Sequence, residues 1–350
     1  MNALMQEPKA TAMDHLPPER LSSGRLQSML EEHGRWVESS RRQGRCLELP
    51  GECLREAKFW KADLQEANLE GADLSGANLQ EARLQEARLT RAKLNGAVMW
   101  RANLHMAILD GADLEEARLG GAKLQGTALR EANLQRANLH MAKLQGACLK
   151  GASLKGANLK EANLWEANLE GADLEDADLR GANLARANLL RANLAGANLE
   201  GANLGRARLQ GARLERAKLG RAVLHGAGLQ WANLESADLQ MADLQESDLW
   251  RCNLQMAKLY DAVLGSAKLQ GANLLGANLR NADLEGANLQ GADMAGAHFE
   301  GANLRGANLT AANIRGADLT EATGLTVDQI RSAIMDDKSR VPAHLVSGVA

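Results

Sequence analysis

The chain has 350 residues, and its 41 lysines and arginines nearly balance its 44 aspartates and glutamates, for a formal net charge of −3 at pH 7. No stretch is apolar enough to act as a signal peptide or to span a membrane, so we expect a cytoplasmic protein without a membrane partner. The four cysteines show no metal-ligand spacing, which favours free thiols in a reducing compartment; they are Cys46, Cys53, Cys148 and Cys252.

The first segments do not repeat. Residues 1–20 are polar and carry Pro8, Pro17 and Pro18, so we expect a mobile N-terminal tail. Residues 21–53 begin with a serine cap, and their apolar residues share one helical face: Leu26, Met29, Leu30, His33, Trp36 and Val37. We expect a capping helix followed by a stretch that leads into the next segment. A dimerisation helix is the alternative.

A strict period of five begins at Leu54. From Leu54 to Leu319 an apolar residue, called position i below, recurs in 54 consecutive pentapeptides. After the first repeat, position i−2 is alanine or another small residue, i−1 is mostly Asn, Asp, Arg or Lys, and i+2 is often Gly or charged. Leucine at position i is replaced by Phe59, Met99, Met294, Phe299 and Ile314, and alanine at i−2 is replaced by Thr127, Ser247 and Cys252.

Neither regular secondary structure can use this period. One pentapeptide advances an α-helix by about 500°, which leaves no apolar stripe, and an odd spacing on a strand alternates between its two faces. A chain that turns a corner in every pentapeptide avoids both problems, because each leucine then points inward. We therefore expect a β-solenoid built of short parallel strands, with glycine favoured at turn positions that need positive φ.

The repeated A-[ND]-L-x-x pattern resembles the pentapeptide-repeat family over residues 54–321. This resemblance implies an all-β fold, a right-handed quadrilateral parallel β-helix in which four pentapeptides complete one coil. On that basis the repeats form about 13.5 coils and a rod roughly 65 Å long.

The C-terminal segment, residues 322–350, predicts a second cap. Thr326 and Gln329 have the spacing of a capping box, followed by apolar Ile330 and Ile334. We expect a short helix over the last coil and then an extended tail. A dimerisation helix is the alternative at this end too. Because uncovered ends of a solenoid invite association, we expect a monomer or an end-to-end dimer.

The pattern does not favour an enzyme. Four histidines lie in the array, and the two that share a side, His105 and His225, are six coils or about 29 Å apart. No Ser–His–Asp or Cys–His group is expected to assemble, and the leucine-filled interior leaves no pocket. We expect no catalytic residues, no metal and no cofactor.

Some pentapeptide-repeat proteins resemble B-DNA in shape and charge and protect type II topoisomerases from inhibitors, which makes a DNA mimic that binds DNA gyrase the alternative function. Such a mimic needs a predominantly negative rod. The outward residues of the four predicted sides instead have net charges of −4, +1, −2 and +3, and binding of nucleic acid is not expected either. A basic belt stands out, formed by Arg206, Arg208, Arg213, Arg216, Lys218 and Arg221.

The hypothesis we favour is a non-enzymatic scaffold that binds protein partners through unusual outward residues. Three groups are candidates for that surface. Trp60, Trp100, His140 and Tyr260 all occupy i+1 of one side; Trp231 and Trp250 are expected on adjacent coils of another side; Met241, Met256 and Tyr260 are expected around one corner.

Overall fold

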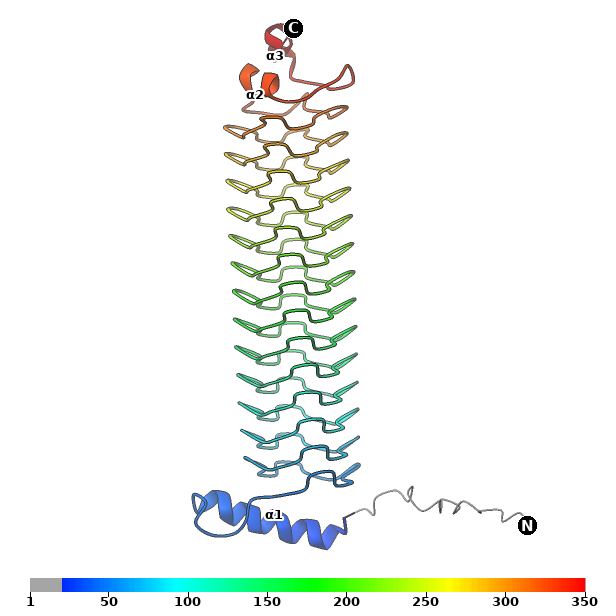
Figure 1. The fold of residues 1–350 in the computed structure, drawn as a ribbon, viewed down its shortest axis with the longest axis vertical. Helices are drawn as coiled ribbons and strands as arrows, with labels where there is room; N and C mark the ends of the chain where they lie inside the picture. The colour runs from blue at the N-terminus through cyan, green and yellow to red at the C-terminus, as the bar shows by residue number, and fades with distance from the viewer. Residues whose placement is uncertain (1–20, 350) are drawn as a thin grey trace, which may run out of the picture.

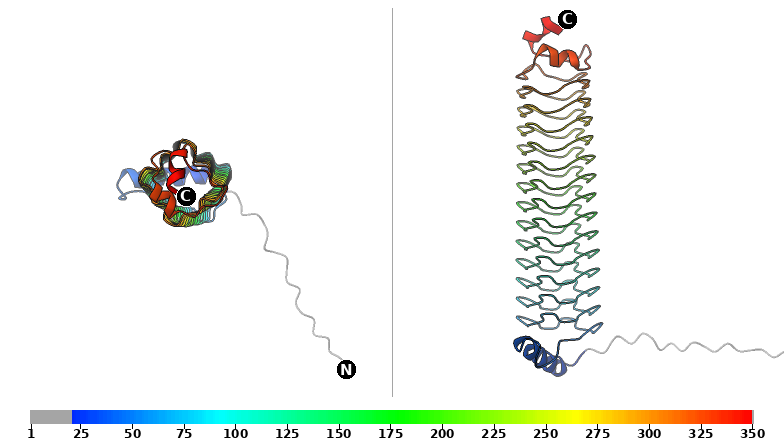
Figure 2. Two further views of the ribbon diagram at one scale, coloured as in Figure 1. Left: turned by 90° about the horizontal axis from the view of Figure 1, so that it is seen from above. Right: turned by 60° about the vertical axis from the view of Figure 1, so that its left-hand side comes forward.

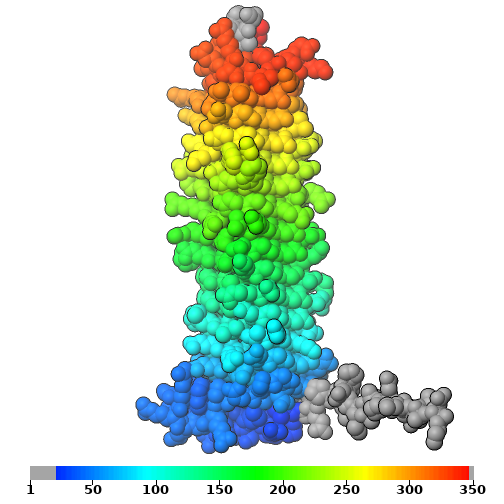
Figure 3. Space-filling model, in the orientation of Figure 1, coloured from blue at the N-terminus to red at the C-terminus, as the bar shows by residue number. Residues whose placement is uncertain are grey.

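The computed structural model describes residues 21–349. The chain forms a long, straight column of stacked coils, with one helix across the N-terminal end and two short helices at the other end (Figures 1 and 2). On the face drawn in Figure 3, side chains fill the spaces between the coils and make a continuous rod. Within the described residues, no helix is both long and apolar enough to cross a membrane.

Each coil contains four pentapeptides. The residue at i−1 makes a parallel β-bridge with the equivalent residue four pentapeptides later, as in Asp63 with Arg83 and Asn233 with Asn253. This coil length agrees with the one that the family resemblance implied. Each side contributes a single bridge rather than an extended strand, because a corner follows within the same pentapeptide. The right hand of the coil stays a prediction.

The interior is a dry column of side chains. Leu184 at position i and Ala182 at i−2 both have no exposed surface, and nearly the same holds along the array except at Ala57 and Ala62, which are only partly buried. Two buried hydroxyls replace alanine without leaving a polar group unpaired: Thr127 donates to the Leu104 carbonyl (2.9 Å) and Ser247 to the Leu244 carbonyl (2.6 Å). Burial raises the pKa of the Cys252 thiol, so this cysteine stays protonated.

Every corner has the same backbone geometry. The amide of the next small residue closes the turn, as in Ala87 N–H to the Leu84 carbonyl (3.1 Å). From Gly51 to Gly316, position i+2 is left-handed whatever its residue type, with φ of 58° at Glu116 and 62° at Gly121. The preference for glycine at i+2 is thereby explained, since only glycine adopts this conformation without steric cost.

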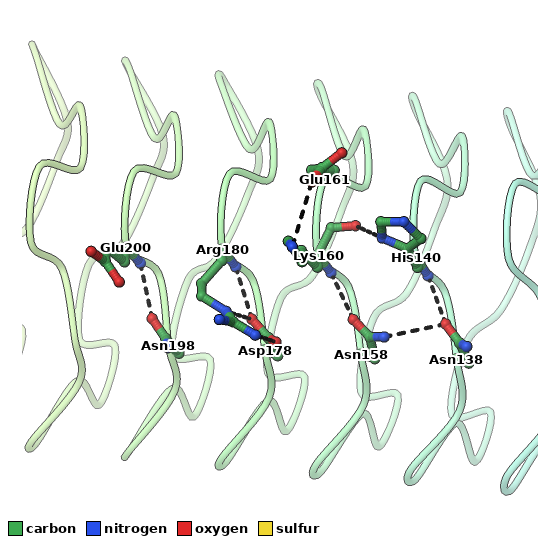
Figure 4. Close-up of polar contacts among 9 residues, drawn as sticks. All are labelled: Asn138, His140, Asn158, Lys160, Glu161, Asp178, Arg180, Asn198 and Glu200. Atoms are coloured by element: carbon green, nitrogen blue, oxygen red, sulfur yellow. Dashed lines mark hydrogen bonds and ion pairs between the residues drawn. The ribbon is translucent and has the colours of Figure 1, made fainter.

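The polar residue at i−1 serves the same corner. The Asn138 side-chain oxygen accepts the backbone N–H of His140, two positions later, at 3.1 Å (Figure 4). Its neighbour one coil on, Asn158, donates to that oxygen at 3.4 Å. Shorter asparagine contacts occur elsewhere, at 2.8 Å between Asn253 and Asn233. Asparagine at i−1 thus stabilises a turn and links two coils, a role the sequence analysis missed.

The N-terminal end is closed by α1 (Ser23–Glu38), whose first turn is capped by Ser22. The predicted tail, residues 1–20, lies outside the described residues. The coils begin one repeat before Leu54, because Leu47 and Leu49 are buried and Glu48 bridges Asn68. In this first repeat Leu47 occupies position i−2, where later repeats have a small residue.

A buried histidine joins α1 to the first coil. His33 is fully buried, and its Nδ1 accepts the backbone N–H of Leu47 at 3.0 Å. Nδ1 is therefore unprotonated, while Nε2 has no hydrogen-bond partner among the described residues. Burial lowers the pKa of His33 below 6.5, against the opposing influence of the Asp63 and Glu66 carboxylates.

Acidification is therefore expected to weaken the attachment of α1. Because the folded-state pKa of His33 is depressed, the unfolded state binds the extra proton first, and stability falls as pH drops below about 6.5. Amide hydrogen exchange of α1 at pH 7 and pH 5 measures this loss. His33→Asn keeps an acceptor but does not titrate, so its exchange should change less between the two pH values; an equal change would contradict the assignment.

The C-terminal end is closed by α2 (Val327–Ser332) and α3 (Ala343–Val349). The capping box of Thr326 and Gln329 is present, and the Gln329 amide also donates to the carbonyls of Leu304 and Ala307 (2.9 and 2.8 Å). Between the helices the chain adds two bridges to the last coil, at Ile334 and Arg340.

We predicted an extended C-terminal tail, and this prediction is wrong for residues 343–349, which form α3. This helix contacts α2 and has a buried Leu345. The apolar pattern of such a short helix is not recognisable as helical in the sequence.

Candidate binding surface

Four of the predicted residues share one column of corners without forming one patch. Trp60, Trp100, His140 and Tyr260 are separated by whole coils and all occupy i+1. Trp60 is 56% exposed and lies 4.5 Å from the Lys61 ammonium. Trp100 instead covers the next coil: a Cβ added to Gly120 would meet its ring at 1.9 Å. Trp60 and Trp100 therefore make no ring contact, and Tyr260 lies six coils beyond His140.

His140 has its own partner. Its Nδ1 lies 3.0 Å from the carbonyl oxygen of Lys160, to which it donates (Figure 4). Farther along this column Arg180 pairs with Asp178 at 2.6 Å and lowers the pKa of that carboxyl. The middle of the column is thus a surface of internally paired polar groups.

The two tryptophans predicted on adjacent coils do meet. The ring centroids of Trp231 and Trp250 lie 4.9 Å apart at an interplanar angle of 83°, an edge-to-face contact. The Arg251 guanidinium lies over both rings, at 5.0 Å from Trp231 and 4.8 Å from Trp250. The tryptophans are 55% and 39% exposed, so the cluster projects from the rod. We call these three residues the Trp–Arg cluster.

Sequence reasoning missed Arg251, although a signal was available. Arg251 follows Trp250 in the chain and lies four pentapeptides, or one full coil, after Trp231, so the coil length alone places it beside both. Trp165, 41% exposed on a different corner, was also missed.

The methionine group is divided between two corners. Met241 donates its backbone N–H to the carbonyl of Tyr260 (2.9 Å), so these two lie on neighbouring coils of one corner. Met256 donates instead to the carbonyl of Leu275 (2.9 Å), at another corner. The expected gathering around one corner is wrong for Met256, because each pentapeptide turns its own corner.

Comparison with known proteins supports the sequence resemblance. A family model described as pentapeptide repeats matches overlapping segments that together run from residue 53 to residue 323. The chain belongs to the pentapeptide-repeat family. No curated protein sequence matches it.

Solved structures of other pentapeptide-repeat proteins are similar to this one. HetL from Nostoc sp. strain PCC 7120, involved in heterocyst differentiation regulation, is 29% identical over 84% of this chain and 98% of its own, with a TM-score of 0.26. Trypsin-treated QnrB1, a plasmid-mediated fluoroquinolone resistance protein, is 19% identical over 58% and 95%, with a TM-score of 0.28. These TM-scores are too low to support an argument about function.

Many charges on this pentapeptide-repeat rod are paired between coils. Three of the six carboxylates at residues 166–178 are paired in this way: Glu166 with Arg186, Glu170 with Lys150, and Glu175 with Lys155 (3.1, 3.0 and 2.9 Å). Lys155 also lowers the pKa of Glu175. The basic belt differs, since within the described residues only Arg213 has an ion pair, with Glu215 at 3.3 Å.

The described part of the rod also lacks a group of three or more His, Cys, Asp or Glu side chains that could hold a metal ion. A groove of about 640 Å³ lies between α1 and the first coil. It is lined mainly by apolar and uncharged side chains, among them Leu26, Leu30, Leu54 and Ala57.

Proposed function

We propose that this pentapeptide-repeat protein is a non-enzymatic cytoplasmic scaffold, a right-handed four-sided coil that binds a protein partner at the Trp–Arg cluster. The observation that carries the proposal is the contact of two exposed tryptophans with one arginine on adjacent coils. Tryptophan and arginine are the residue types that most often dominate binding energy at protein interfaces.

The rod supports this role physically. Hydrogen bonds and bridges on both neighbouring coils hold the backbone at Trp231 and Trp250, and Trp231 N–H donates to the Trp250 carbonyl (3.1 Å). The contact of the Arg251 guanidinium with both rings restricts the side chains as well. A surface already ordered before binding loses less conformational entropy when a partner docks.

The alternative, a DNA mimic that occupies the DNA channel of gyrase, has less support. It requires a predominantly negative rod, whereas even in the acidic stretch at residues 166–178 three of the six carboxylates are paired with bases on adjacent coils. We therefore prefer the protein-binding scaffold.

Replacing both tryptophans of the cluster with alanine is expected to abolish partner capture. The Trp231→Ala, Trp250→Ala variant should retain specific partners at least about tenfold less than the unaltered protein, because hot-spot residues contribute about 2 kcal/mol or more each. Affinity purification from the native cell with quantitative mass spectrometry measures this.

Trp165→Ala is the matched control, since it removes an exposed tryptophan that has no ring contact within the described residues. It should retain the same partners as the unaltered protein. Identical captured proteins from all three baits would refute the role of the cluster, provided that their circular-dichroism spectra agree.

A further inference from the structure

The Trp–Arg cluster lies on the most positive of the four sides, and this side is not uniform along the rod. Near the N-terminal end three of its four bases are paired with acids one coil away, Arg88 with Glu70, Arg130 with Asp110, and Lys150 with Glu170; the fourth, Arg91, has no ion pair within the described residues. Beyond this region its exposed bases have no ion pair within the described residues; they are Arg191, Arg208, Arg251 and Lys268.

These bases surround the tryptophans. Arg191, Gly211, Trp231 and Arg251 follow one another in a single column, one per coil, so Arg191 lies two coils from Trp231, about 10 Å. Arg208 stands in the neighbouring column and bridges Gly228. Gly211 has no side chain, so only Arg191 itself reaches the space between Arg191 and Trp231. The side chains of Gln210 and Gln230 lie over Gly228, beside Arg208. We call Trp231, Trp250, Arg191, Arg208 and Arg251 the aromatic–basic patch.

A single carboxylate faces this patch from the same side. Asp248 follows Gly228 in its column, and its side-chain oxygen accepts the Trp250 backbone N–H at 3.2 Å. It makes no ion pair with a described base, so the charge of the arginines is not cancelled by a direct contact.

Arg251 is placed to bind a carboxylate. Its guanidinium carbon lies 4.8 and 5.0 Å from the centroids of the two rings, and within the described residues its N–H groups have no acidic partner. A guanidinium presents its donors at the edge of its plane, which remains available when its face is stacked on a ring. Its planar fork matches a carboxylate with two parallel hydrogen bonds.

We propose that the aromatic–basic patch binds an acidic segment of the partner protein, with glutamate or aspartate side chains on Arg251, Arg191 and Arg208 and an apolar side chain against Trp231. This inference rests on the proposed scaffold function and adds the chemistry of the partner. A nucleic-acid strand fits less well, because the edge-to-face tryptophans offer no parallel slot for bases and Arg251 already lies over both rings.

Fluorescence anisotropy with the purified full-length protein tests the proposal. The first probe is a fluorescein-labelled peptide of six glutamates and two leucines. The second is the same peptide with glutamines in place of the glutamates, and the third is a labelled oligothymidine. The glutamate peptide should bind, the glutamine peptide should not, and raising NaCl from about 0.05 to about 0.5 M should weaken binding strongly. Arg251→Gln should weaken it on the order of tenfold, as expected for loss of a charge-assisted contact.

Arg91→Gln is the matched control. Arg91 occupies the same column and the same left-handed backbone position, and like Arg251 it covers a glycine of the next coil, but no tryptophan accompanies it. The affinity of the Arg91→Gln variant for the glutamate peptide should equal that of the unaltered protein. Equal binding of the glutamate and glutamine peptides, equal effects of the two arginine substitutions, or binding of the oligothymidine alone would each overturn the proposal.

The scaffold proposal and the acidic-segment proposal can be refuted independently. If the acidic peptide does not bind but the double tryptophan variant still loses its captured partners, the cluster is a binding surface and the partner chemistry is wrong. If the tryptophan variant loses nothing, the scaffold proposal fails whatever the peptide does.

Discussion

Leu189→Ala is expected to lower the free energy of unfolding by about 2–5 kcal/mol, and Leu190→Ala, at the next position, by less than about 1 kcal/mol. Leu189 has no exposed surface and lies in the central column, whereas Leu190 is half-buried at a corner. Alanine at position 189 leaves a cavity that cannot collapse, because the bridges above and below hold the coil at its spacing.

Urea unfolding followed by circular dichroism measures both variants. The comparison is matched, because the two substitutions remove the same atoms from neighbouring residues and differ in the direction of the side chain. Equal losses at positions 189 and 190 would mean that the inward file of leucines does not provide the main stabilisation.

Deleting residues 232–236 is expected to abolish the Trp–Arg cluster while preserving the coils. The deletion removes one complete pentapeptide, so the inward pattern remains, but the segment between Trp231 and Trp250 becomes one pentapeptide shorter. Adjacent coils juxtapose residues that are four pentapeptides apart, so Trp250 moves to another side of the rod. Partner capture should fall as far as it does in the double tryptophan variant, although both tryptophans are still present.

Deleting residues 292–296 is the control, since it also removes one pentapeptide but lies beyond the cluster and leaves its spacing intact. This variant should capture partners normally and show the same tryptophan fluorescence as the unaltered protein. Normal capture by the 232–236 deletion would show that the tryptophans act singly rather than as a cluster.

Much of the fold follows from the position of each residue in its pentapeptide. The buried file at i, the small residues at i−2 and the left-handed corner at i+2 all repeat without interruption, so one repeat predicts the next. Trp231 and Trp250 could be paired in advance for the same reason, because the coil length relates their positions. The two ends of the rod are less predictable from the pentapeptide pattern, since α3 and the first coil at Leu47 depend on contacts that do not repeat.

The side chains at the corners show where periodicity stops being informative. Trp60 and Trp100 share a column, yet Trp100 lies over Gly120 instead of extending toward a partner ring. Arg251 could have extended into solvent and instead lies on two rings. Each corner side chain has several rotamers, and the neighbours on adjacent coils select among them.

The sequence by itself determined which side chains point inward, because a period of five permits only a chain that turns once per repeat. Only the tertiary structure decided which outward residues touch, which charges are neutralised and how each end is closed. The physical reason is that inward positions are governed by a strong, repeated burial of apolar surface. Outward contacts each contribute about 1 kcal/mol or less and depend on rotamers that no pattern specifies.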